Sequence, residues 1–192
     1  NDGTEDYRIT KLDMFGVVEW DNSFGGFEAD FPESIRQTND GGYIIAGYSA
    51  SNDGDVLGNH GSFDAWIVKL DALGNLEWQK SLGGTSDDYA TSIQQIFDGG
   101  YIVAGYTGSN DGDVLGNHGG YDAWVLKLDV SGNLVWQKTL GGTSDDRATS
   151  IEQTTDSGYI VAGYTGSNDG DVSGNHGGYD AWVLKLDVSG NL

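Results

Sequence analysis

A repeat of 58 residues constrains this chain more than any other feature of its sequence. The stretch from Gly83 to Leu134 recurs almost letter for letter from Gly141 to Leu192, and a looser copy precedes both. Repeats of this length are typical of propellers, solenoids and arrays, in which a unit buries its apolar faces only when a neighbour stacks on it. Two sets of tryptophans fix the register: Trp20, Trp78 and Trp136, and Trp66, Trp124 and Trp182.

Each unit is predicted to contain four short antiparallel strands. Alternating or continuous apolar runs of five to seven residues are separated by turn signals such as Asp98-Gly99-Gly100, and the chain has 32 glycines and one proline. This pattern predicts an all-β protein of propeller-like blades, and the alternative is a linear stack of four-stranded units. In the second unit the predicted strands are Ala90–Gln95, Tyr101–Tyr106, Ala123–Leu128 and Leu134–Leu140.

The repeat divides the chain into four parts. Residues 1–24 form a partial unit with a third and a fourth strand, residues 25–82 and 83–140 are full units, and residues 141–192 are a unit without its last strand. Three units are too few to close a propeller ring, so an unpaired edge is expected at each end. The start at Asn1, without methionine, suggests a processed product or a fragment.

Unpaired edges suggest head-to-tail assembly. The N-terminal strands of one molecule are predicted to complete or cap the last unit of the next by strand addition, which gives a filament or a ring. The alternative is that the chain is a piece of a longer repeat protein. The residues predicted to carry assembly are Tyr7, Ile9, Leu12, Val18 and Trp20 at one end, and Trp182, Leu184 and Leu186 at the other.

The charge of the chain excludes several classes of partner. Thirty acidic and nine basic residues give a net charge of −21, which repels nucleic acid and anionic membranes and attracts divalent cations. No apolar run approaches the ~20 residues that cross a bilayer, so membrane insertion is not expected. The absence of cysteine excludes disulfides and cysteine-ligated metals.

One acidic loop recurs in each unit, beginning as Ser51-Asn52-Asp53-Gly54-Asp55 in the first. Calcium binds 6–8 oxygen ligands, often from loops bent at glycine, so these carboxylates are candidate ligands. The loop lacks the EF-hand pattern, and the alternative is that Asn and Asp build turns. The candidate calcium ligands are Asp53, Asp55, Asp111, Asp113, Asp169 and Asp171, and Asn59 or Asp64 and their equivalents could add to the shell.

Two further polar positions are predicted to be structural. Asp30, Asp88 and Asp146 persist in every unit although their neighbour does not, which favours a turn or cap over a metal site. The three histidines, His60, His118 and His176, lie 58 residues apart without a second histidine or a cysteine beside them. We therefore expect a loop histidine bonded to the backbone and not a zinc ligand.

Aromatic residues suggest a core role and, as an alternative, a ligand site. The six tryptophans fall on predicted strands and are expected to fill the spaces between units. Some tyrosines flank the acidic loops closely enough to form a platform for glycans. The candidates are Tyr106, Tyr121, Tyr164 and Tyr179.

An enzyme is not expected. Catalysis requires one site whose groups have different environments and separated pKa values, whereas every acidic loop here is copied nearly unchanged. The chain also lacks the GxSxG, P-loop and HExxH motifs. A hydrolase would require an asymmetric cleft of which the sequence gives no sign.

The run GGYDAWVLKLDVSGNLVWQKTLGGTSDDRATSI, followed by SGYIVAGYT, resembles the bacterial β-propeller repeat family often called SBBP. The resemblance covers essentially the whole chain, which departs from the pattern in its WQK strand and its longer acidic loop. It implies a propeller-type fold outside the cell and supplies no catalytic residues. The sequence therefore predicts an extracellular structural or adhesive repeat protein without catalysis that self-associates, with calcium as its only candidate cofactor. The alternative is a lectin-like module that recognises glycans or surfaces.

Overall fold

The computed structural model describes residues 5–192, which contain thirteen β-strands and no helix that could cross a membrane. The strands of the first half are β1 (Tyr7–Leu12), β2 (Val18–Phe24), β3 (Asp30–Gln37), β4 (Tyr43–Ser49), β5 (Asp64–Leu70) and β6 (Leu76–Leu82). Those of the second half are β7 (Asp88–Gln95), β8 (Tyr101–Thr107), β9 (Asp122–Leu128), β10 (Leu134–Leu140), β11 (Asp146–Gln153), β12 (Tyr159–Thr165) and β13 (Asp180–Leu186).

Consecutive strands pair antiparallel into four sheets. These are the N-terminal hairpin (β1–β2), the first sheet (β3–β6), the second sheet (β7–β10) and the three-stranded third sheet (β11–β13). The prediction of an all-β fold made of repeated four-stranded antiparallel sheets is confirmed.

The strand register repeats with the sequence. Ile44, Ile102 and Ile160 each pair with a lysine of the next strand, namely Lys69, Lys127 and Lys185. The first strand of each sheet also carries an irregularity after its third residue, as between Ala90 and Ser92. A one-residue slip would turn every buried side chain to the other face, so near-identical sequences fix near-identical sheets.

The turn between the third and fourth strands shows how the sequence sets this geometry. The Asp129 carboxylate accepts bonds from the amides of Ser131 and Asn133, at 2.9 and 2.8 Å, and from the Asn133 side chain. Gly132 has φ of +77°, a conformation that side chains of other residues disfavour. The Asp-x-x-Gly-Asn pattern of each unit therefore closes its own turn.

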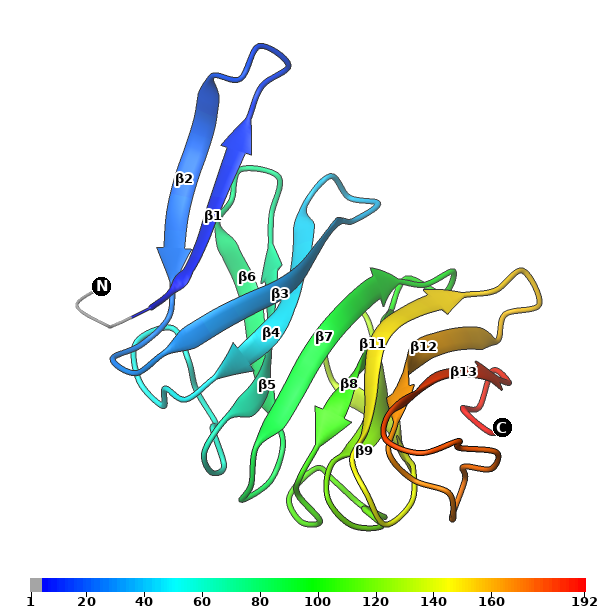
Figure 1. Ribbon diagram of the computed structural model, residues 1–192. Coiled ribbons are helices and arrows are strands. Elements are labelled where there is room, and N and C mark those ends of the chain that lie inside the picture. The colour runs from blue at the N-terminus through cyan, green and yellow to red at the C-terminus, as the bar shows by residue number, and fades with distance from the viewer. Residues whose placement is uncertain (1–4) are drawn as a thin grey trace.

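The three sheets pack face against face, and their first strands β3, β7 and β11 lie side by side (Figure 1). Ile44 and Ile67 of the first sheet pack against Ile93, Val103 and Trp124 of the second. The equivalent residues of the second and third sheets form the next layer. Trp66 and Trp124 are completely buried, as predicted for residues that fill the space between units.

The N-terminal hairpin covers the outer part of the first sheet (Figure 1). Tyr7, Trp20 and Phe24 point into this contact, and the Tyr7 hydroxyl donates to the Trp66 carbonyl at 3.1 Å. The opposite face of the hairpin carries the ion pair of Arg8 and Asp21 at 2.7 Å and, at its far end, the exposed Leu12.

Candidate functional site

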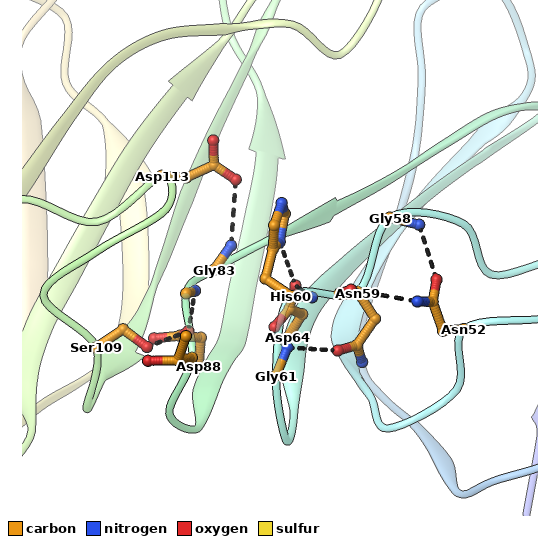
Figure 2. A network of polar contacts seen from close by, with 12 residues as sticks. Asn52, Gly58, Asn59, His60, Gly61, Asp64, Gly83, Asp88, Ser109 and Asp113 are labelled. Atoms are coloured by element: carbon orange, nitrogen blue, oxygen red, sulfur yellow. Dashed lines mark hydrogen bonds and ion pairs between the residues drawn. The ribbon is translucent and has the colours of Figure 1, made fainter.

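The acidic loop of each unit contacts the connector that leads into the same unit. In the second unit the Asp111 carboxylate accepts bonds from the Thr85 amide and hydroxyl, both at 2.8 Å, and these bonds lower the pKa of Asp111. Asp113 accepts a bond from the Gly83 amide at 3.3 Å (Figure 2). The loop therefore fastens the peptide that joins two sheets.

The same contacts recur at the other candidate calcium ligands. Asp53 and Asp55 accept bonds from the amides of Phe27 and Gly25, while Asp169 and Asp171 accept them from Thr143 and Gly141. Within residues 5–192, no group of three or more acidic or histidine side chains is arranged to hold a metal ion. Calcium binding at these loops stays a prediction, and the observed bonds agree with the turn role weighed against it.

Asp88 is a buried acceptor at the start of the second sheet. It accepts bonds from the hydroxyls of Thr107 and Ser109 and from the Gly84 amide. Asp30 and Asp146 have the same set of partners in their own units. The prediction that this aspartate is structural is confirmed, since it ties the connector to the second strand and to the acidic loop.

The histidine of each loop contacts an aspartate. His60 Nδ1 lies 2.7 Å from the Asp64 carboxylate, which also accepts the His60 amide at 3.0 Å (Figure 2). His118 and Asp122 repeat this pair. The expectation that the ring bonds to the backbone is wrong, because a buried carboxylate four residues later offers a stronger, charged acceptor.

Two buried carboxylates meet at each junction between sheets. Asp64 Oδ1 has no hydrogen-bond partner, and it lies with Asp88 Oδ2 beside Gly83. A Cβ on Gly83 would lie 2.9 and 2.6 Å from these oxygens, so no side chain fits there. Asp6 Oδ1 and Asp122 Oδ1 are unpaired at the equivalent junctions. Burial raises the pKa of Asp64, Asp88 and Asp122.

Sequence reasoning missed this carboxylate pair. It treated Asp64 as a possible addition to the loop and Asp88 as a local cap. The sequence did contain a signal for this pair. An aspartate recurs at the same position of the repeat, as Asp6, Asp64, Asp122 and Asp180. Only the packing of one sheet on the next brings it beside the glycine doublet that precedes Asp88.

The candidate glycan residues lie in a row of half-buried rings across the three sheets. Tyr106 and Tyr121 meet edge to face at 5.4 Å between centroids. Tyr89 stacks on Tyr106 at 4.7 Å from one side, and Arg147 lies over both Tyr106 and Tyr121, 4.6 and 4.7 Å from their centroids. These two rings are thus covered by residues of the protein itself.

The predicted assembly residues are largely used inside the molecule. Tyr7, Ile9 and Trp20 pack on the first sheet, while Leu12 and Val18 are exposed. At the other end, three apolar side chains of β13 face the second sheet, whereas Val183 is exposed on the opposite face. The three are Trp182, Leu184 and Leu186.

Comparison with known proteins gives limited similarity. No family model matches the chain. The regulatory protein FlaEY of Caulobacter vibrioides is 28% identical over 162 residues, which are 78% of this chain and 17% of that protein. The chain therefore spans less than a fifth of the length of this curated relative. A crystal structure of a protein of unknown function from Bacteroides caccae aligns with a TM-score of 0.34 and 13% identity, covering 96% of this chain and 73% of that one.

Proposed function

We propose that this chain is a non-catalytic structural or adhesive repeat module, outside the cell, that associates head to tail with further copies into a filament or a ring. The supporting feature is the open face of the third sheet, defined by Ile160, Ala162, Ala181 and Val183. Ile160 is 40% exposed and Val183 63%, whereas their equivalents in the second sheet, Ile102 and Val125, are fully buried. Exposed apolar faces of this kind mark interaction sites.

The inner junctions indicate what covers such a face. Ile102 and Val125 are covered by the third sheet, which packs on the second through its first strand. A matching sheet of a second copy is therefore the partner that the open face fits, because it carries the same residues at the same places.

The other end of the molecule offers a complementary surface. Ile35 is 42% exposed, whereas its equivalents Ile93 and Ile151 are buried against the preceding sheet. A cavity of about 200 Å³ lies beside Ile35 and is lined also by Ile9, Pro32 and Ile45. The inner half of the first sheet is thus open beside the hairpin, at the place where Ile93 and Ile151 are covered in the other sheets.

β1 and β13 are both third strands of the repeat unit. When the third sheet of one copy packs on the first sheet of the next, both strands would occupy one position, so one of them must move. β13 faces the second sheet with the apolar side chains Trp182 and Leu184. If β1 of another copy took the place of β13, Arg8 and Thr10 would stand at these two positions. Burying an arginine there without a partner is unfavourable. We therefore expect the N-terminal hairpin to shift and β13 to stay.

Light scattering over a range of protein concentrations tests this proposal. The mass should rise with concentration for the parent chain, and Val183→Lys should abolish the rise, because a charge would be buried in the contact. Val135→Lys, at a similarly exposed valine of the second sheet, should leave it unchanged. A constant monomer mass for the parent chain at high concentration would refute head-to-tail association.

The finer parts of the proposal depend on the repeat pattern. The first strands, which lie side by side, support a propeller-type arrangement. The resemblance to bacterial β-propeller repeats supports the same arrangement and a place outside the cell. A non-catalytic role is supported by the acidic contacts, which recur in each unit and give no single asymmetric site.

Glycan recognition is the second candidate function, and the row of partly exposed rings favours it. Tyr179 is 60% exposed beside Tyr164, so this pair is the accessible part of the row. Binding on a glycan array that is lost on Tyr179→Ala would support this function. Silence across a broad array would favour the structural role.

A further inference from the structure

A lysine is the next-to-last residue of the third strand in each unit, and in two places a glutamate of the fourth strand binds it. Lys69 lies 2.8 Å from the Glu77 carboxylate and 2.9 Å from that of Asp40, and its side chain is only 3% exposed. Lys11 of the N-terminal hairpin lies 2.7 Å from Glu19, which has the same strand position as Glu77. The place beside this lysine therefore accepts a carboxylate.

In the second unit the same place is open. The fourth strand has Val135 where the other two have glutamate, and within residues 5–192 the Lys127 ammonium forms an ion pair with Asp98 alone, at 2.6 Å. A cavity of about 220 Å³ lies there, lined also by Leu128 and Val130. The second sheet is packed between the first and the third, so the cavity lies inside the row of sheets.

The side chains around the cavity indicate what kind of molecule fits it. Val130 and Val135 are 60% and 55% exposed and form an apolar wall beside the ammonium. The Tyr159 hydroxyl is buried without a hydrogen-bond partner. Burial raises the pKa of Tyr159, and the nearby charge of Lys127 acts against this rise. A net charge of −21 repels multiply charged anions, so these groups favour a single carboxylate on an apolar body.

We propose that the cavity beside Lys127 binds a small organic acid with one carboxylate and an apolar body. The carboxylate takes the place that Glu77 fills in the first unit and pairs with the ammonium, while the hydrocarbon part covers Val130 and Val135. Lys69 binds two carboxylates at once, so Lys127 can accept a second one as well.

A titration with sodium butanoate at neutral pH, followed by the NMR signals of the valine methyl groups, tests the proposal. We expect shifts at Val130 and Val135 that sodium chloride at the same concentration does not cause. Butanamide has the same shape without the charge that pairs with Lys127, so it should bind more weakly by at least about fivefold. Equal binding of the two compounds, or no shift of these valines with butanoate, would overturn the proposal.

Two reciprocal substitutions show whether the missing glutamate makes the site. Val135→Glu restores the residue of the other units and should abolish butanoate binding at Lys127, whereas Val135→Ile adds no charge and should retain it. Glu77→Val opens the equivalent place and should create a second butanoate site, seen as new shifts at Ala72. Both exchanges use residues that the repeat already carries at this position, and circular dichroism checks that the strands persist. Binding that survives Val135→Glu, or a folded Glu77→Val variant without the second site, would refute this assignment.

Discussion

At the residue scale, the junction between sheets depends on buried carboxylates with unequal numbers of partners. Asp88 accepts bonds from two hydroxyls and one amide, whereas Asp64 Oδ1 accepts none. Buried polar groups without partners are rare and costly. The recurrence of this arrangement at Asp6 and Asp122 shows that it belongs to the repeat and is not an accident of one contact.

The donors to Asp88 should matter for stability. Thr107→Val keeps the shape of the side chain but removes the buried hydroxyl that bonds Asp88, and we expect a loss of about 1–3 kcal/mol in the free energy of unfolding. Thr85→Val removes a hydroxyl that bonds the exposed carboxylate of Asp111, and should change stability by less than about 0.5 kcal/mol. Urea unfolding of both variants measures the difference, and equal losses would contradict this account.

The junction carboxylates also predict how stability depends on pH. Burial raises the pKa of Asp64, Asp88 and Asp122 in the folded protein, so the folded state binds protons more tightly than the unfolded chain. Their contribution is complete below the unfolded pKa of about 4 and is lost as the pH rises through the folded values. We therefore expect Tm to fall as the pH rises above about 4.

Asp64→Asn tests the origin of this pH dependence. The amide cannot ionise, so Tm at neutral pH should rise and its dependence on pH should become weaker. Glu28→Gln removes the same charge from an exposed position and should leave the dependence close to that of the parent chain. If both variants flatten the curve equally, the net charge of the protein and not the junction explains it.

At the scale of single elements, the N-terminal hairpin packs on the first sheet where the inner junctions have a full sheet. Its apolar side chains cover the outer half of the first sheet, and its other face carries the Arg8–Asp21 ion pair. Because it covers only part of that sheet, Ile35 and the adjacent cavity remain open. The hairpin therefore limits how closely another copy can approach.

Removal of residues 1–24 should strengthen self-association, because it exposes on the first sheet the surface that matches the open face of the third sheet. The mass by light scattering should rise at lower concentration than for the parent chain. Adding Val183→Lys to the shortened chain should suppress this rise. Continued association of that double variant would indicate non-specific aggregation and contradict the role given to the hairpin.

The elements also show what the sequence could predict. Period-two alternation and turn signals located all four strands of a unit, because each strand is built from local contacts that repeat. The sequence could not predict which side chains of β13 face the second sheet. Its alternating pattern is the same whether Trp182 points to the preceding sheet or to a following one. The stacking of Arg147 on Tyr106 and Tyr121 could not be predicted either. The residue at the same repeat position in the previous unit is the uncharged Tyr89, so the repeat gives no sign of a cation there.

At the scale of the whole molecule, the N-terminal hairpin and the third sheet lie at opposite ends of a row of sheets (Figure 1). The second sheet is covered on both faces, and the third sheet on one. The contribution of a repeat unit to stability depends on its neighbours, so the third sheet should be the least protected part of the row.

Hydrogen exchange, resolved residue by residue by NMR, tests this central claim most directly. Strands β8 and β12 have the same sequence, YIVAGYT, and each is paired with a strand on both sides, so a difference in their protection reports the cover on each sheet and not its composition. We predict slower exchange in β8 than in β12 at low concentration, with the gap closing as the concentration rises. Equal protection of the identical strands in dilute solution, or a gap that concentration leaves unchanged, would contradict the account.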